Sequence, residues 1–131
     1  MNATQLANEL LSNDPSRRRE AADRLATLGE EAKSATVALV EACDDDSLRD
    51  LCVGALEELG TPPTNQLPQL AALLRSPNDT VAYWAATLLG RSKSDAADHL
   101  ADLERLSIDA KRSKAVQDRA AWAIEKVQPA R

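Results

Sequence analysis

Four segments of this chain repeat one pattern of small and large apolar residues. A short pair of residues, small in most copies, recurs at 21–22, 52–53, 85–86 and 120–121, and a larger aliphatic follows at Leu25, Leu56, Leu89 and Ile124. The steps between these aliphatics are 31, 33 and 35 residues. A period of this length is typical of a stacked repeat array, in which each unit contacts mainly its neighbours. The pattern says how the chain is built, and says little about what it binds.

The composition favours helices as the repeating element. The chain has 131 residues, of which 44% are hydrophobic, but only 2% are aromatic and none is Phe. Alanine and leucine must therefore fill the core, which favours closely packed helices over sheets, where Val, Ile and aromatic residues dominate. We expect an all-α fold in a single domain, residues 1–131.

A second helical pattern precedes each repeated segment, so we expect eight helices in four hairpins. The four repeats span approximately 3–29, 31–60, 65–91 and 95–128. Side-chain oxygens at Asp14, Ser47 and Asp79 precede the second helices and are predicted to cap them. Gly29 and Gly60 are predicted to end two of these helices in a left-handed conformation. The small residues Ala21, Cys52, Ala85 and Ala120 are predicted to be buried where two helices approach closely.

The second helices resemble those of HEAT repeats. Residues 17–29 read R-R-R-E-A-A-D-R-L-A-T-L-G and residues 48–60 read L-R-D-L-C-V-G-A-L-E-E-L-G. This is similar to the D-x-x-V-R-x-x-A-A-x-A-L-G pattern of the HEAT subgroup that resembles phycobilisome lyases. The resemblance implies an α-solenoid, or alpha-alpha superhelix, of four HEAT-like helical hairpins. It also implies that Arg18 and Arg49 bridge neighbouring units, a contact that Ala82 and Gln117 cannot copy in the last two repeats.

The same resemblance places the second helices on the concave side of the array, where a partner would bind. Tyr83 and Trp122 fall opposite or far from the apolar stripes of their helices, and such residues are over-represented at binding hot spots. Two structural interpretations stay open: Trp84 packs on the adjacent unit, and Trp122 covers the open end of the stack. The candidate partner-binding residues are Arg19, Asp23, Asp50, Leu51, Gly54, Tyr83, Trp84, Thr87, Asp118 and Trp122.

The charge of the chain works against nucleic acid and anionic membranes as partners. The net charge is −5 and the pI is about 4.9, whereas both of those partners need a basic surface. Residues 41–58 hold seven acids and one base, and residues 105–119 hold five bases and two acids. No signal peptide or membrane span is evident, and two cysteines are too few for a disulfide scaffold, so we expect a cytoplasmic protein.

Other candidate sites have simpler structural explanations, and we expect no metal and no cofactor. His99 is the only histidine, so it lacks a partner for metal ligation and is expected at or near the surface. The run from Asp44 to Asp46 lacks the spacing of a calcium loop and fits an acidic helix start. Cys43 and Cys52 lack an activating histidine and are expected to be inert, with Cys52 a small buried thiol.

We therefore expect a non-catalytic protein–protein interaction module whose partner lies across the concave face and carries a basic segment and an apolar anchor. The alternative is an enzyme or accessory subunit similar to the bilin lyases of this repeat subgroup, with Tyr83, Trp84 and Trp122 beside a tetrapyrrole groove. A third possibility, a likeness to the HEAT-like DNA glycosylases, fails because Asp23, Asp50 and Asp118 make the predicted face acidic.

Overall fold

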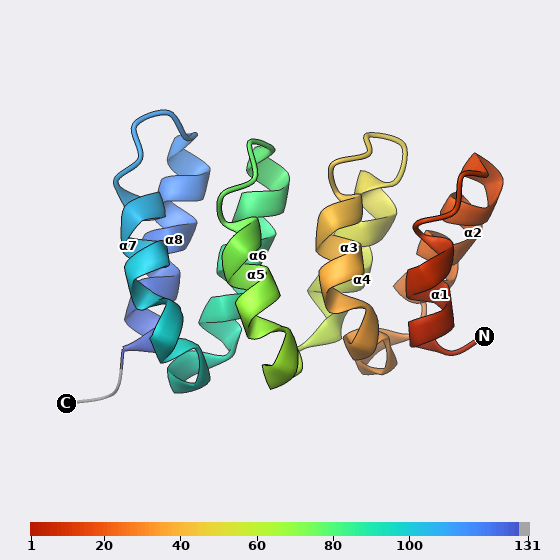
Figure 1. Cartoon of the computed structure of the whole chain (residues 1–131), viewed down its shortest axis with the longest axis horizontal. Coiled ribbons are helices and arrows are strands. Elements are labelled where there is room, and N and C mark those ends of the chain that lie inside the picture. The colour runs from red at the N-terminus through yellow and green to blue at the C-terminus, as the bar shows by residue number, and fades with distance from the viewer. Residues whose placement is uncertain (129–131) are drawn as a thin grey trace. The chain divides into compact units, whose positions relative to one another are not determined.

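The chain is all-α throughout the residues that the structure describes. A computed structural model describes residues 1–128, and they contain eight α-helices, three 3₁₀ segments and no strand (Figure 1). The last three residues of the expected 1–131 domain lie outside the described part. The helices form four hairpins, as predicted, and the chain divides into two compact units, Met1–Pro63 and Thr64–Arg131. Each unit holds two of the hairpins.

The first unit consists of two hairpins that pack through their second helices. Its helices are α1 (Ala3–Glu9), α2 (Pro15–Ala26), α3 (Thr36–Ala42) and α4 (Arg49–Leu59), with the 3₁₀ segment η1 (Gly29–Ala35) between the hairpins. Helix α2 packs on α4, and η1 lies against α1 and α4. The largest fully buried side chains here are Leu25, Leu39, Val40, Leu56 and Leu59. Burial of these aliphatic side chains supplies most of the unit's stability.

The second unit repeats this arrangement. Its helices are α5 (Leu67–Leu73), α6 (Asp79–Arg91), α7 (Leu100–Ser107) and α8 (Lys114–Val127), with η2 (Thr64–Gln66) and η3 (Lys93–His99) before the two hairpins. Helix α6 packs extensively on α8, and α5 and α7 each pack on the second helix of their own hairpin. The core contains Leu70, Leu88, Leu89, Leu103, Val116 and Val127. The face between α6 and α8 is therefore the central contact of this unit.

The first helices of three hairpins are shorter than the sequence predicts, because their opening turns are 3₁₀. The expected second repeat begins at residue 31, but the 3₁₀ segment η1 continues to Ala35 before helix α3 begins. Ala32 and Ala35 are fully buried and three residues apart. A 3₁₀ turn places residues i and i+3 above one another, so both methyl groups face the core. Similar turns precede α5 and α7.

The predicted burial of the first small position in each pair is confirmed. Ala21, Cys52, Ala85 and Ala120 all have exposed fractions of 2% or less. The second members of the pairs vary, since Ala22 and Ala86 are fully buried, Val53 is half-buried and Ala121 is exposed. The first position is therefore the one that is buried in every repeat.

Two of the three predicted helix caps are wrong. Asp14 caps α2 by accepting a hydrogen bond from the Ser16 amide at 2.9 Å. Asp79 is the first residue of α6, and Asn78 before it accepts from the Thr80 and Val81 amides. Ser47 does not cap α4, because its hydroxyl donates to Asp45 instead. Adjacent Asn and Asp are both good caps, and sequence alone does not choose between them.

Three positions after second helices have positive φ angles. Gly29 and Gly60, as predicted, have φ values of 57° and 83°. After α6 the corresponding residue is Lys93, with φ of 52°. A side chain in this region is strained by its Cβ, by roughly 1–2 kcal/mol. The third repeat therefore uses a lysine where glycine would fit better.

Replacing Lys93 by Gly should raise the free energy of unfolding by about 0.5–1 kcal/mol, because the strain of the Cβ is removed. Urea denaturation followed by circular dichroism measures it. Lys93→Ala is the matched control, since it removes the same charge but keeps a Cβ at positive φ, and it should give no such gain. Equal effects of the two variants would contradict the conformational explanation.

Helices α6 and α8 approach one another closely at Gly90. A Cβ on Gly90 would collide with the Trp122 ring and would lie 3.1 Å from the Ala123 Cα atom. The ring of Trp122 thus occupies the space that any other residue at position 90 would need. Gly54 in α4 is the opposite case, because a Cβ there would have no atom within 4 Å.

The same substitution should therefore have opposite effects at these two helical glycines. Gly90→Ala should destabilise the fold by about 1–3 kcal/mol through overpacking against Trp122 and α8. Gly54→Ala should stabilise it by about 0.5–1 kcal/mol, because alanine loses less backbone entropy in a helix. Thermal unfolding of both variants tests this, and a stable Gly90→Ala protein would show that α6 and α8 are farther apart.

Candidate functional site

Arginine side chains bind the loops of the first unit together. Arg18 donates from Nη1 to the Ser12 carbonyl at 2.7 Å, and its Nε lies 3.8 Å from Asp45 in the next hairpin. Arg49 repeats the first contact, donating to the Cys43 carbonyl at 2.9 Å, and pairs with Asp46. Hydrogen bonds from Ser47 lower the pKa of Asp45, with a smaller contribution from Arg18. Arg18 therefore links two hairpins of this unit, while the contacts of Arg49 with Cys43 and Asp46 stay within its own hairpin.

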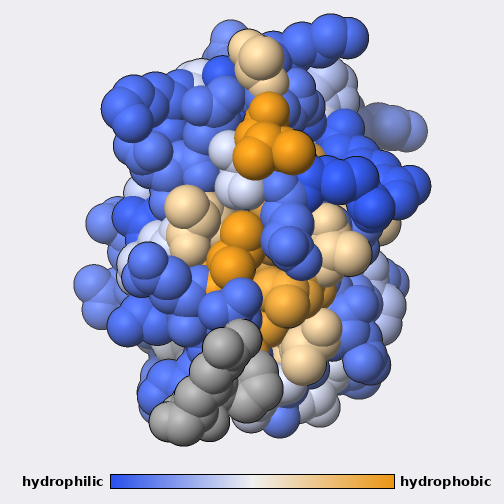
Figure 2. Space-filling model, turned by 90° about the vertical axis from the view of Figure 1, so that its left-hand side faces the viewer, coloured by the Kyte–Doolittle hydropathy of each residue, from blue (hydrophilic) through white to orange (hydrophobic). Residues whose placement is uncertain are grey.

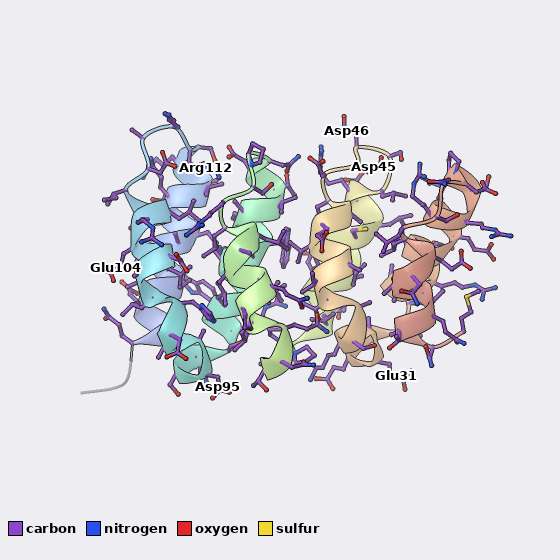
Figure 3. The ribbon with its side chains drawn as sticks, in the orientation of Figure 1. Glu31, Asp45, Asp46, Asp95, Glu104 and Arg112 are labelled. Atoms are coloured by element: carbon purple, nitrogen blue, oxygen red, sulfur yellow. The ribbon has the colours of Figure 1, made fainter. Side chains whose placement is uncertain are left out.

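The second unit makes equivalent contacts with different residues. Gln117 donates from Nε2 to the Asp109 carbonyl at 2.6 Å. Ala82 has no polar side chain, but Arg112 from the α7–α8 loop approaches the Leu74 carbonyl at 3.4 Å and Asp79 at 3.2 Å (Figure 3). The side chain of Arg112 is only 10% exposed. These arginine and glutamine contacts are structural, so we do not count them as a binding site.

A different arginine lies between two aromatic rings in the second unit. The Arg119 guanidinium carbon is 4.9 Å from the Tyr83 ring centroid and 4.7 Å from the Trp122 centroid. Arg119 Nη2 also donates to the Tyr83 hydroxyl at 2.7 Å. Arg119 and Trp122 are three residues apart on α8, so they lie on the same side of the helix, and Tyr83 comes from α6. The three side chains, which we call the aromatic–arginine stack, join the two central helices of the unit.

The stack lies at an open hollow on the surface. The hollow has a volume of about 400 Å³ and is lined by Tyr83, Ala115, Asp118, Arg119 and Trp122. A smaller hollow of about 250 Å³ adjoins it, sharing Tyr83 and Ala115. Both lie wholly within the second unit. An open, half-apolar groove with one fixed cation is suited to a peptide segment rather than to an enclosed small molecule.

The predicted binding residues fall into three groups by exposure. Arg19, Asp23, Asp50 and Asp118 are exposed, while Leu51, Gly54, Tyr83 and Trp122 are half-buried. Trp84 and Thr87 are buried, at 8% and 5% exposure, and the Thr87 hydroxyl donates to the Tyr83 carbonyl. Both therefore belong to the interior, and we do not retain them in the site.

Within each unit the structure brings predicted residues together. Tyr83, Asp118 and Trp122 line one hollow in the second unit. In the first unit Arg19 and Asp23 lie on α2 and Asp50, Leu51 and Gly54 lie on α4, which pack together. Arg19 donates to the Ser47 carbonyl at 3.2 Å. Trp122 packs against Gly90 of α6, so its role is not limited to covering the open end of the stack.

The sequence analysis missed Arg119 as a site residue. It counted this arginine only in the charge of the C-terminal region. The available signal was its position three residues before Trp122 on a predicted helix, which places a cation beside the indole ring. The contact with Tyr83 could not be read from the sequence, because it depends on how α6 and α8 pack.

Apolar side chains gather on another face of the second unit, over α7 and α8 (Figure 2). Ile108, in the loop between these helices, is 81% exposed. Leu100 and Ile124 of the same two helices are half-buried.

The two cysteines are buried thiols, as expected for Cys52. Cys43 and Cys52 are fully buried, and the Cys43 thiol lies 3.4 Å from the Leu39 carbonyl. Burial raises the pKa of each thiol from 9.0 to about 12, and in Cys43 the neighbouring Cys52 adds to the shift. His99 is half-buried, as expected. Among residues 1–128 no three His, Cys, Asp or Glu side chains are grouped as metal ligands would be, and no helix could cross a membrane.

The raised pKa values predict a loss of stability at alkaline pH. Both thiols stay protonated in the folded state up to about pH 12, whereas in the unfolded chain they ionise near pH 9. Their contribution to stability is therefore complete below pH 9 and is lost as the pH rises toward 12. The slope should approach about 2–3 kcal/mol per pH unit for two thiols.

Denaturant unfolding between pH 8 and pH 11 measures this slope, since both pH limits bracket the ordinary thiol pKa. The double variant Cys43→Ala/Cys52→Ala is the matched control, because other repeats already carry alanine at the position of Cys52. The free energy of unfolding of this variant should fall less steeply as the pH is raised. Parallel slopes for the two proteins would refute the pKa shifts.

Comparisons with known proteins bear on the fold. No family model matches the chain, and no curated protein matches it. Among solved structures it is similar to an engineered protein whose crystal structure was determined by the Northeast Structural Genomics Consortium, with 22% identity and a TM-score of 0.61. The match covers 97% of this chain and 63% of that protein. The chain thus spans less than two thirds of its length, and at this identity the similarity concerns the fold alone.

Proposed function

We propose that this chain is a non-catalytic protein–protein interaction module, built as an α-solenoid of four HEAT-like hairpins. Three observations support the architecture. The repeats recur every 31–35 residues, each hairpin places one small buried residue at the same position of its second helix, and the loops are bound by recurring side-chain contacts to carbonyls. Such arrays are commonly binding scaffolds, although the fold by itself assigns no partner.

The observation that carries the binding function is the aromatic–arginine stack. Tyr, Trp and Arg are the residues most enriched at binding hot spots. Tyr83 and Trp122 keep part of their rings exposed beside a hollow of about 400 Å³. Their positions are already fixed by Arg119 and by Gly90, so binding would lose little side-chain entropy. Aromatic rings that are already held in place gain more from contact with a partner protein than from contact with water.

The first unit offers a second, more polar contact region. Arg19, Asp23 and Asp50 are exposed there, and Leu51 and Gly54 lie half-buried on α4. The bare backbone at Gly54 leaves room for a partner side chain, since a Cβ would meet nothing within 4 Å. A basic segment of the partner would be attracted to the acids of α2 and α4.

The test begins with capture of a partner from an extract of the source cell, using the full chain as bait, and continues with calorimetric titration of the purified partner. Tyr83→Ala and Arg119→Ala should each weaken binding by about 2 kcal/mol or more, roughly 30-fold, because they dismantle the stack. Arg17→Ala removes an exposed arginine of the first unit and should leave the affinity for this site unchanged. Melting temperatures check that the variants fold.

The result that would overturn the proposal is a chemical reaction. If incubation with a linear tetrapyrrole changed its absorbance spectrum, and the pigment then transferred to an acceptor protein, the bilin lyase-like alternative would replace it. Binding that is unaffected by both stack variants would move the interface away from the second unit.

A further inference from the structure

The guanidinium of Arg119 keeps hydrogen-bond donors available at the hollow. A guanidinium has five N–H donors, and in this structure one nitrogen, Nη2, donates to the Tyr83 hydroxyl. Within residues 1–128 no carboxylate oxygen lies within 4 Å of the Arg119 nitrogens. By contrast, Arg18, Arg49 and Arg112 each pair with an aspartate. Arg119 is thus a cation supported by two rings that has no carboxylate partner among the described residues.

The neighbouring acids are already engaged with other bases. Asp118 lines the same hollow, but its carboxylate lies 3.1 Å from the Lys114 ammonium. Asp79, beside the adjoining hollow, lies 3.2 Å from Arg112. In both pairs the carboxylate already has a base beside it, whereas no carboxylate lies within 4 Å of Arg119 among residues 1–128. Of the two charged side chains that line the larger hollow, Arg119 is therefore the one left to attract an opposite charge, although the chain as a whole carries −5.

The rings make this cation selective for a planar anion beside an apolar group. Tyr83 and Trp122 flank the guanidinium, which orients its plane and holds it without full hydration. A carboxylate matches the fork of guanidinium donors and accepts two parallel hydrogen bonds. Ala115 and the exposed ring surfaces offer apolar contact for a neighbouring side chain.

We propose that this hollow binds an acidic, apolar segment of the partner protein, in which an Asp or Glu carboxylate accepts hydrogen bonds from Arg119 and an adjacent aliphatic side chain packs on Tyr83 and Trp122. The inference rests on the proposed interaction function and specifies the chemistry of the segment that the second unit recognises. It differs from the basic segment expected from the sequence, which would meet the exposed acids of the first unit, whereas the acids beside this hollow, Asp118 and Asp79, are paired with Lys114 and Arg112.

Three blocked peptides of equal length test the proposal directly. They are acetyl-Leu-Glu-Leu-Glu-Leu-amide and its analogues with Gln or Lys in place of Glu. Each unlabelled peptide is titrated into the isotopically labelled full chain. The NMR chemical shifts of the Arg119 Nε–H and the Trp122 indole N–H are followed. The Glu peptide should move both signals, and the Gln peptide should bind at least about tenfold more weakly, because it lacks the charge-assisted pair.

Variants separate recognition by Arg119 from general charge. Arg119→Lys keeps the charge but loses the planar fork and should bind the Glu peptide about tenfold more weakly. Arg17→Lys makes the same change at an exposed position of the first unit and should not alter the affinity. Added salt should weaken binding of the Glu peptide more than binding of the Gln peptide.

Three results would overturn the inference. The Glu and Gln peptides could bind equally, none of the peptides could move the two signals even at millimolar concentration, or the Lys peptide could move them most strongly. The last result would leave the proposed interaction function intact with a basic partner. If a captured protein still binds in a manner that requires Arg119 while the Glu peptide fails, only the chemistry assigned to the segment is wrong.

Discussion

The close approach of α6 and α8 at Gly90 is the constraint on which the second unit depends. With no side chain at position 90, the Trp122 ring lies directly against the backbone of α6. This fixes the ring, and the fixed ring supports the guanidinium of Arg119, which in turn donates to Tyr83 on the neighbouring helix. A helix contact of the core thus determines the geometry of a surface group. Packing of the core and the geometry of the aromatic–arginine stack are coupled here through a single indole ring.

The contacts between loops show how a repeat protein can vary its sequence while keeping one structural function. Arg18 and Arg49 each donate to a carbonyl at the end of the first helix of their own hairpin. In the last hairpin Gln117 does this, and in the third an arginine from the following loop approaches the carbonyl of Leu74. An unpaired carbonyl near a buried helix end is unfavourable, so some donor is required, but its origin in the sequence is free to change.

The helical hairpins and their small buried positions could be predicted because they depend on local periodicity. Asn78 rather than Asp79 caps α6 because both residues are suitable and the choice depends on the register of one turn. The burial of Thr87 was missed for a different reason, whereas packing of Trp84 on the adjacent unit was one of the two open interpretations. One apolar stripe per helix was expected, but α6 packs on α5, α8 and η3 and is buried from Val81 to Gly90 except at Tyr83. A helix covered on several sides has no single face opposite its core.

The position of Arg119 also follows from helix geometry once the packing is known. Asp118 precedes it by one residue, which turns the two side chains about 100° apart on α8. Asp118 can instead reach Lys114 one turn earlier, and these two are paired. Arg119 is left facing α6, where it contacts the Tyr83 ring of that helix and the Trp122 ring of its own helix rather than a carboxylate. Contact with the rings offsets part of the hydration that the Arg119 guanidinium loses, by roughly 0.5–1 kcal/mol for each exposed cation–π contact. A carboxylate of the proposed partner segment would add to this stabilisation without displacing the guanidinium.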